Sequence, residues 1–453
     1  MSDNCPVLDH TNLNSSHPLR ISREGGWRTT VGFIRNAFDS LEDMPKRADM
    51  ILTRLFGVPT VVLAHPSLIS QVLTDSKGVW IKDRMTRRAS DVFGEGLLLS
   101  EGDIWKRQRK ILNPGFSSVR FDAYASVMRE RTAVAVANWP DQGRINVAAE
   151  MARLTLDVAV RTLFGADITE RNARRVSESF SAVSDFFASP LNMLPFSIPK
   201  WLPLPLIQRY VRAVAELDSV ISELISMRRS KTQSGEDLLS MLLSSRDESG
   251  GFSDREVRDQ AVTFLLAGHE TTALGLTFAL FELGRRPDLR ARLFAEVDAA
   301  HLEVGIESLP FTTQVIKESL RLYPPAYALS RENTCDVTLG GLLIKKGSVV
   351  VASPWALHRD ARWHANPLEF RPERWTPEYE KTIPSGAYFP FGMGARKCIG
   401  SRFAMIEAVL LLTGIARRFD WNSIDKHLPP LQPTLTCRPT KPVRVSVQER
   451  SSY

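Results

Sequence analysis

The sequence predicts a mainly α fold with a smaller β region, and three features support this expectation. Apolar residues recur with a helical period through most of residues 105–251. A further apolar stretch, from Ser253 to about Leu283, predicts one unusually long helix, which at about 1.5 Å per residue would cross a whole domain. After Tyr323, the run VTLGGLLIKKGSVVVAS alternates glycine turns with β-branched residues, a pattern typical of a small antiparallel sheet.

Composition places the chain among ordinary globular proteins. Of its 453 residues, 43% are hydrophobic and 24% are charged, which argues against a fibrous or wholly disordered chain. The formal net charge of +7 is modest for a dedicated nucleic-acid-binding protein. The four cysteines, at positions 5, 335, 398 and 437, form no CxxC pair. A secreted disulfide scaffold and an all-cysteine zinc site are therefore not expected.

The N-terminal residues 1–20 are polar and lack a hydrophobic period, so we expect a flexible segment followed by a single domain over 21–453. The segment has no apolar run of the kind found in signal peptides and membrane anchors, which predicts a cytoplasmic protein without a membrane tether. Next, the run TVVL at 60–63 predicts a short strand, and PSLISQVL predicts a helix that begins near Pro66.

A long apolar loop is predicted at 189–207, because its five prolines forbid a continuous helix. Three interpretations remain open for this segment. It can be a buried connector, a lid over an apolar substrate, or a patch that touches a membrane surface.

The predicted long helix begins with a capping box, formed by Ser253 and Glu256. His269 and Glu270 in its middle would be costly in lipid, so we interpret it as a central strut of the fold. The segment AGHETT at 267–272 combines small, acidic and hydroxyl residues, and Thr271 can bond to a preceding carbonyl and open a groove. A bent core helix is the alternative. A metalloprotease HExxH motif is excluded, because Ala273 stands where its second histidine would be.

Cys398 lies in FPFGMGARKCIG, directly before a helical run. A lone cysteine is usually an inert core residue. Here the surrounding glycines allow close backbone approach, and the following helix dipole would favour a thiolate. Arg396 and Lys397 add positive charge, which further favours a thiolate or binds an anionic cofactor. The residues alone therefore indicate a thiolate metal ligand as one of two interpretations.

Two shorter patterns add weaker signals. Glu318 and Arg321 share one face of a helix in KESLRLYPP, and Arg371 or Arg374 in FRPERW could complete an ion network with them. In WKRQRK, Trp105 and Arg109 lie four residues apart on one helix face, an arrangement suited to holding a carboxylate.

Together these segments resemble the cytochrome P-450 family of heme-thiolate monooxygenases, over about residues 60–444. FGMGARKCIG matches the family's FxxGxRxCxG signature, AGHETT its oxygen-activation helix, ESLR its ExxR motif and WKRQR its WxxxR motif. The resemblance implies the cytochrome P-450 fold of the soluble bacterial type, with the long helix crossing a heme b (iron protoporphyrin IX).

The resemblance also implies roles for individual residues. Cys398 would be the axial thiolate and metal ligand, shielded by Phe391, and the expected propionate-binding residues are Arg396, Trp105, Arg109 and Arg331. Glu270 and Thr271 look like the acid and alcohol pair that supplies protons to bound dioxygen, and Glu318, Arg321 and Arg374 like the structural ion network.

The implied reaction inserts one oxygen atom from O2 into a hydrophobic substrate, such as a terpenoid, steroid or fatty-acid-like molecule. Only 55 residues follow Cys398 (453 minus 398), so electrons are expected from a separate acidic ferredoxin or flavodoxin with its reductase. Basic residues flank the motifs and predict its docking patch, with scattered solvated charge as the alternative: Lys106, Arg107, Lys110, Lys397 and Arg402.

Two other functions remain open at this point, a peroxide-dependent peroxygenase or isomerase and a non-catalytic heme sensor. The residues expected to line the substrate pocket lie at 84–99, at 190–205, at Phe264 and Ala267, and at 326–329, and Arg87 or Arg88 could hold a carboxylate.

Overall fold

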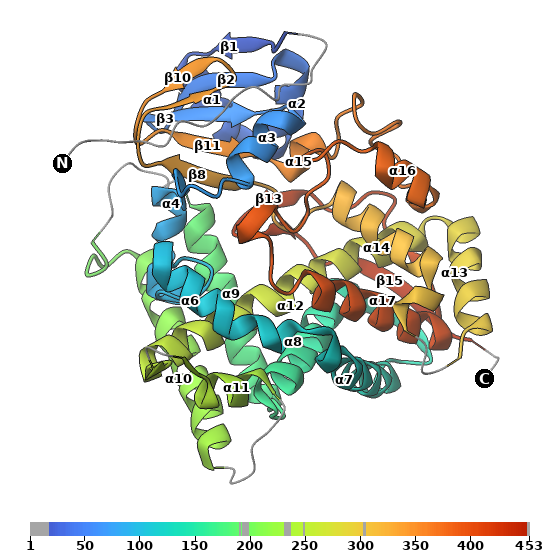
Figure 1. The fold of residues 1–453 in the computed structure, drawn as a ribbon. Coiled ribbons are helices and arrows are strands. Elements are labelled where there is room, and N and C mark those ends of the chain that lie inside the picture. The colour runs from blue at the N-terminus through green and yellow to red at the C-terminus, as the bar shows by residue number, and fades with distance from the viewer. Residues whose placement is uncertain are drawn as a thin grey trace.

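The computed structural model describes residues 18–450 except 190–191, 193–198, 231–236, 248–249 and 302–304. Residues 1–17, most of the segment predicted to be flexible, lie outside the described residues. At the end of that segment, Arg20 donates from Nη2 to Asp49 Oδ1 over 3.0 Å. The strands within residues 21–81 and 329–352 gather in one region, and helices fill most of the remainder (Figure 1).

The largest sheet has six strands in the order β1-β2-β3-β11-β8-β4. Their bounds are β1 Ile21–Arg23, β2 Met50–Leu55, β3 Val58–Leu63, β4 Trp80–Ile81, β8 Leu329–Asn333 and β11 Val349–Ala352. The predicted strand at 60–63 is thus confirmed as part of β3. Strand β11 runs parallel to β3 and antiparallel to β8, with Val350 opposite Arg331.

The glycine turn after Tyr323 is confirmed. Strands β9 (Val337–Leu339) and β10 (Leu342–Ile344) form an antiparallel hairpin. Gly340 and Gly341 connect them with φ of +56° and +82°, values that a type I′ turn requires and that glycine adopts without strain. The expectation of one antiparallel sheet was wrong for β11, because its β-branched residues pair with β3 and β8 in the mixed sheet.

Most of the remaining chain is helical. The helices other than the longest are α1 Gly26–Arg35, α2 Ala37–Arg47, α3 Pro66–Leu73, α4 Arg84–Arg87, α5 Ser90–Phe93, α6 Gly102–Leu112, α7 Ser118–Ala137, α8 Val147–Phe164, α9 Glu170–Ala188, α10 Pro205–Ser230, α11 Leu238–Ser244, α13 Pro287–Ala299, α14 Pro310–Leu322, α15 Pro354–Leu357, α16 Pro377–Thr382 and α17 Ser401–Arg418. Short 3₁₀ turns lie at Asn113–Phe116, Ile306–Ser308, Pro372–Arg374 and Gly394–Arg396.

Smaller sheets complete the fold. β5 (Gln142–Asn146), β15 (Arg444–Glu449) and β12 (Phe419–Ser423) form a three-stranded antiparallel sheet. Two hairpins consist of β6 (Arg246–Asp247) with β7 (Gly250–Gly251), and of β13 (Leu431–Pro433) with β14 (Cys437–Pro439). Strands β5, β6 and β7 interrupt the region predicted to be helical between 105 and 251.

The predicted long helix is α12, Asp254–Gly284, with 31 residues. Its capping box is present, because the Ser253 hydroxyl accepts the Glu256 N–H and the Glu256 carboxylate accepts the Ser253 N–H. The helix crosses the middle of the molecule and packs against α8, α10, α14 and α17 (Figure 1). It is long and apolar enough to cross a membrane, but 83% of its most apolar window is buried within the protein. It is therefore a core helix.

The predicted proline-rich loop at 189–207 is only partly described, and residues 190–191 and 193–198 lie outside the described residues. Its last part is helical rather than a loop, since α10 begins at Pro205. A proline at the first position of a helix lacks only an N–H that would have no partner there. Two apolar side chains just before α10 are exposed, Trp201 at 77% and Leu204 at 41% of their full exposure.

Candidate active site

The middle of α12 differs from both of its ends. Apolar residues between 257 and 266 belong to one hydrophobic core and apolar residues between 273 and 283 to another, whereas none of 267–272 belongs to either. Ala267 is exposed and Gly268 and Thr271 are partly exposed, although the other residues from 261 to 284 are buried. A Cβ atom placed on Gly268 would come no closer than 4.0 Å to Leu163. One face of the AGHETT segment therefore borders solvent-accessible space inside the fold.

Threonine hydroxyls bond back along the helix at this point, as predicted. Thr271 Oγ1 donates to the Ala267 carbonyl over 2.8 Å, and Thr272 Oγ1 donates to the Gly268 carbonyl over 3.2 Å. From α8, Thr155 Oγ1 donates to the carbonyl of His269 over 2.8 Å. These hydroxyls compete with backbone N–H groups for the carbonyls, which favours a local opening of the helix.

The two ionisable residues of the segment point away from the accessible face. His269 is buried, its Nδ1 lies 2.7 Å from the Leu265 carbonyl, and burial lowers its pKa to about 4. Glu270 pairs with Arg438 of β14. Burial raises the pKa of Glu270, whereas the charge of Arg438 lowers it, and the net pKa lies above the usual value. The other carboxylate oxygen of Glu270, Oε2, is buried without a hydrogen-bond partner among the described residues.

The Cys398 loop is a tight turn that precedes α17. The Cys398 N–H donates to the Phe391 carbonyl over 2.9 Å. Gly394 has φ of +65°, and a Cβ there would lie 2.4 Å from the Leu73 carbonyl oxygen, so this position requires glycine. A Cβ on Gly392 would lie 3.6 Å from Leu329 of β8, which places that strand beside the loop.

Cys398 is exposed as a residue, although protein atoms surround its thiol densely. Burial raises the pKa of its thiol, while the Gly400 N–H and the charges of Arg109 and Lys397 lower it. The net pKa is raised. The surroundings expected to favour a thiolate are therefore present, but in the protein alone burial outweighs them.

Cationic side chains converge near this loop. Arg396 Nη2 donates to the Ser100 carbonyl over 2.7 Å and pairs with Glu101, and its guanidinium carbon lies 4.3 Å from the ring centre of Trp105. Its Nη1 is buried without an acceptor among the described residues. Arg109 Nη1 donates to the Lys397 carbonyl over 3.0 Å. The structure thus brings together Trp105, Arg109 and Arg396, three of the residues that the sequence predicts to bind propionate.

Arg331 lies on β8 and is buried except for 7%. Burial lowers its pKa, and Glu101 and Asp83 raise it. Lys82 was missed by the sequence analysis. Burial and the charges of Arg331 and Arg396 lower the pKa of Lys82 to about 7. No local motif marks Lys82, because its neighbours come from distant segments.

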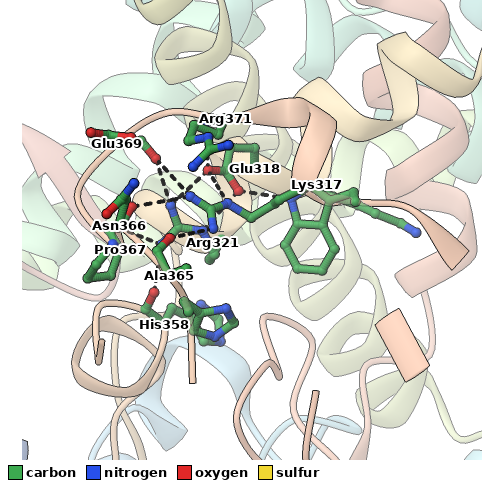
Figure 2. Close-up of polar contacts among 12 residues, drawn as sticks. Lys317, Glu318, Arg321, His358, Ala365, Asn366, Pro367, Glu369 and Arg371 are labelled. Atoms are coloured by element: carbon green, nitrogen blue, oxygen red, sulfur yellow. Dashed lines mark hydrogen bonds and ion pairs between the residues drawn. The ribbon is translucent and has the colours of Figure 1, made fainter. Parts of the chain in front are cut away.

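The ion network around Glu318 has the predicted members (Figure 2). Arg321 donates to both carboxylate oxygens of Glu318, over 2.9 and 2.8 Å, and both side chains are fully buried. Of the two candidates in FRPERW, Arg374 joins through its side chain over 3.0 Å, whereas Arg371 joins through its backbone N–H over 2.9 Å. Arg321 also donates to the carbonyls of residues 358, 367 and 369, which ties this network to the segment that leads to the Cys398 loop.

A family model described as Cytochrome P450 matches residues 31–447, nearly the whole described chain. The chain belongs to the cytochrome P450 family. It is 35% identical to cyclooctatin synthase of Streptomyces melanosporofaciens over 417 residues, which cover 90% of this chain and 91% of that protein. It is 33% identical to pentalenene oxygenase of Streptomyces avermitilis over 386 residues, which cover 84% and 85% of the two chains.

Solved cytochrome P450 structures have the same mainly helical fold with a smaller β region. The heme domain of cytochrome P450DA superposes with a TM-score of 0.81 at 26% identity, covering 96% of this chain and 99% of that one. The retinoic-acid-bound cyanobacterial CYP120A1 superposes with a TM-score of 0.82 at 27% identity, covering 96% and 100%. The protein is a cytochrome P450 monooxygenase with heme as its cofactor.

The residues of the candidate site fit a heme. An exposed cysteine, Cys398, lies just before α17, which suits iron coordination by its thiol. The unpartnered Nη1 of Arg396 and the cluster of Lys82, Arg331 and Arg396 suit carboxylate groups. Among the described residues, no group of three or more His, Cys, Asp and Glu side chains could hold a metal ion.

Proposed function

We propose that this cytochrome P450 hydroxylates a neutral, cyclic terpenoid. The observation that supports this substrate best is the accessible face of α12, where Ala267 and Gly268 leave room beside Thr271. Small apolar residues at this position suit a bulky hydrocarbon. The names of three relatives at 33–35% identity also point this way: cyclooctatin synthase, cyclooctat-9-en-7-ol 5-monooxygenase and pentalenene oxygenase.

A fatty-acid-like substrate is less well supported. The two arginines considered for a substrate carboxylate both have protein partners. Arg87 pairs with Glu332 over 3.2 Å, and Arg88 donates to the Asn192 carbonyl. A carboxylate would have to displace these contacts.

Phe264 packs against Phe116, with 5.5 Å between ring centres, so Ala267 rather than Phe264 borders the accessible space.

The proposed roles of the cofactor-binding residues follow from their contacts. Cys398 binds iron as a thiolate, and Arg109, Lys397 and the Gly400 N–H stabilise its negative charge. Phe391, which lies on the same loop as Cys398, shields the sulfur. The propionates are held by the cationic cluster and its aromatic support, namely Arg396, Trp105, Arg109 and Arg331, with Lys82 as a further member.

When bound, the heme supplies the iron at which dioxygen is reduced and the C–H bond is oxidised. In our proposal, Thr271 holds a hydroxyl at the accessible face, and Glu270 holds a proton in the next position of the helix. The raised pKa of Glu270 makes its carboxyl a proton donor nearer to neutral pH than an ordinary glutamate. Arg438 keeps that carboxyl oriented away from the accessible face.

The electron donor is proposed to be an acidic ferredoxin or flavodoxin that docks at exposed basic residues near the Cys398 loop. Lys110, Lys397 and Arg402 are exposed and support such a patch. Lys106 is exposed but pairs with Asp103 over 2.9 Å. Arg107 is turned toward Glu256 at 2.7 Å and half-buried, so it contributes little to the patch. We also infer a cytoplasmic location, where such redox partners occur.

The first experiment is the absorbance spectrum of the dithionite-reduced protein under carbon monoxide, with Cys398→Ala as control. Thiolate-bound heme gives a strongly red-shifted Soret band that the variant loses. The second experiment supplies cyclic terpenes, NADH, a ferredoxin and its reductase under ¹⁸O2. Product containing one ¹⁸O atom supports the monooxygenase. Turnover with peroxide alone would indicate a peroxygenase, and ligand binding without turnover in either assay would indicate a sensor.

A further inference from the structure

Helix α1 turns its polar face inward and its large apolar side chains outward. Its buried residues are two threonines, Thr29 and Thr30, whereas Trp27 is 82% and Ile34 is 52% exposed. Val31, between them, is partly exposed. Since side chains three and four residues apart share one face of a helix, Trp27, Val31 and Ile34 form one apolar strip on the outside. A surface helix normally packs such a strip against the core, so its exposure marks an interaction surface.

The contacts of the inner face fix this orientation. Helix α1 packs against β2, where the Thr53 hydroxyl donates to the Thr29 hydroxyl over 3.1 Å. A Cβ atom on Gly26 would lie 2.6 Å from the Arg54 carbonyl oxygen, so helix and strand are too close for a larger side chain there. Turning the apolar strip inward would break the hydrogen bond and clash with the strand. The strip is therefore held on the outside by the fold itself.

Three arginines lie beside the apolar strip. Arg28 and Arg35 are exposed on α1, and Arg23 is exposed on β1, the strand that precedes this helix. Among the described residues, none of these three side chains has a hydrogen bond or an ion pair. The acid closest to them in the chain, Glu24, already pairs with Arg47 over 2.8 Å. The flanking arginines therefore carry positive charge that the protein does not neutralise.

A groove of about 590 Å³ separates α1 from α2, and its charges do not favour a peptide. Arg28 and Arg35 line the groove on α1, whereas Asp39 and Asp43 line it on α2. An acidic peptide in the groove would be repelled by the aspartates, and a basic peptide by the arginines. A partner that meets the outer side of α1 contacts the apolar strip and the flanking arginines without entering the groove.

The chemistry of this outer side matches an anionic lipid surface. Helices that lie at a membrane surface combine apolar side chains with neighbouring lysine or arginine residues. Tryptophan prefers the boundary between headgroups and acyl chains, because its ring is apolar and its N–H needs a polar partner. Guanidinium groups form charge-assisted hydrogen bonds with phosphates. A strip of three residues buries little apolar area, so such binding is weak and reversible.

We propose that α1 docks the protein on the surface of an anionic membrane. The apolar strip enters the headgroup region, and the flanking arginines bind lipid phosphates. The docking is peripheral, because the 10 residues of α1 extend only about 15 Å, whereas the hydrocarbon core of a bilayer is about 30 Å thick. It requires neither heme nor turnover.

The first test is flotation of the full-length, heme-loaded protein with lipid vesicles. We expect binding to vesicles of phosphatidylcholine mixed with phosphatidylglycerol, weaker binding to phosphatidylcholine alone, and release by salt. Trp27→Gln should reduce binding, and Arg28→Gln/Arg35→Gln should weaken it by about fivefold for each arginine removed. Absence of binding to the anionic vesicles, or equal binding of Trp27→Gln and the parent protein, would overturn the proposal.

Matched variants control for lost apolar area and lost charge elsewhere on the surface. Leu368→Gln removes an exposed apolar side chain, and Arg171→Gln/Arg255→Gln removes two exposed arginines from α9 and α12. Both variants should bind vesicles like the parent protein. If the arginine control weakens binding as much as Arg28→Gln/Arg35→Gln, net charge rather than α1 is responsible and the proposal is wrong. Unchanged carbon monoxide spectra and unfolding temperatures show that every variant is folded.

Fluorescence quenching by lipids with brominated acyl chains identifies the side chain that enters the membrane. Trp27→Phe keeps the strip apolar, so this variant should still bind vesicles but lose most of the quenching. If quenching persists in Trp27→Phe, another tryptophan, such as the exposed Trp201, enters the membrane and α1 is not the docking face. A dimer that depends on Trp27, seen in sedimentation equilibrium without vesicle binding, would assign the strip to a second copy and refute membrane docking.

Discussion

Arg438 of β14 pairs with Glu270 of α12, and its guanidinium carbon lies 5.3 Å from the ring centre of Phe180 on α9. The Arg438 side chain thus links the β13–β14 hairpin to the two helices α12 and α9. The pair is largely buried, with 24% of the Arg438 side chain and 6% of the Glu270 side chain exposed. Arg438 therefore controls the charge of the acid that we place in proton supply.

Replacing this arginine should destabilise the protein through Glu270. Arg438→Gln leaves a buried carboxylate without its counter-charge, which should cost about 3 kcal/mol in the free energy of unfolding. Because Arg438 lowers the pKa of Glu270, its loss should raise that pKa further and move the alkaline limb of the pH–turnover profile, where the donor loses its proton, to higher pH. Urea unfolding and the pH profile measure the two effects.

The double variant Arg438→Gln/Glu270→Gln is the matched control. It removes both charges, so it should recover most of the lost stability. Equal destabilisation of the single and double variants would show that the pair contributes nothing through charge.

The Glu318 network should dominate stability at acid pH. Burial alone would raise the pKa of Glu318, but Arg321 and Arg374 outweigh burial and the net pKa is lowered. A lowered carboxyl pKa stabilises the fold above the unfolded value of about 4.5 and loses this effect as the pH falls toward the folded value. Glu318→Gln should cost about 3–5 kcal/mol and remove this dependence, because Arg321 is left buried without a counter-charge.

Glu380→Gln serves as the comparison for that measurement. Its carboxylate is 42% exposed and pairs with Lys317 on the surface, so its loss should cost less than about 1 kcal/mol. The stability of Glu318→Gln and Glu380→Gln is measured by thermal unfolding between pH 4 and 7. If both variants lost a similar amount of stability, the Glu318 network would not be the main contributor to stability at acid pH.

Arg396 should control heme retention. Arg396→Met removes the buried Nη1 group, which has no acceptor in the part of the chain that the structure describes, together with the cation stacked on Trp105. A charge-assisted hydrogen bond contributes about 1.5–3 kcal/mol, which corresponds to about tenfold to hundredfold faster heme loss. Transfer of heme to a scavenging apoprotein measures the rate. Arg418→Met, which breaks an exposed pair with Glu449, should not change it.

Glu407 should make the folded state less stable as the pH rises. Its folded pKa of about 8 lies above the unfolded value of 4.5, so the folded state binds the extra proton between these values. The contribution of Glu407 to the free energy of unfolding is then largest below pH 4.5, and it falls by about 1.4 kcal/mol per pH unit up to about pH 8. Glu407→Gln should abolish that slope in urea unfolding. An unchanged slope would mean that Glu407 is ionised or rearranged in the fold.

The basic patch should control association with an acidic electron donor. Lys397→Glu and Lys110→Glu should lower the rate of reduction by the ferredoxin and weaken its dependence on salt, because attraction is replaced by repulsion. Stopped-flow reduction under carbon monoxide measures that rate. Lys345→Glu provides the control, since this lysine is exposed but pairs with Asp336 beside the β9–β10 hairpin. Equal effects at Lys345 would indicate only a response to net charge.

Much of the site could be predicted from the sequence, because its parts depend on neighbours close in the chain. The ends of α12 follow from a capping box and an apolar period that span adjacent turns. The turn before Cys398 needs glycine at Gly394 because its local φ is +65°. The Glu318–Arg321 pair also lies within one helical turn, so its spacing already indicated a contact.

What the sequence determined by itself is therefore the family, the local turns and the residue types that can bind a heme. Only the tertiary structure decided that Glu270 faces Arg438, 168 residues away, and that Lys82 lies with Arg331 and Arg396. Only the fold left both carboxylate oxygens of Glu407 buried without a hydrogen-bond partner among the described residues. The reason is physical: charge and burial depend on which side chains meet in space, and contacts between distant segments leave no periodic signal in the chain.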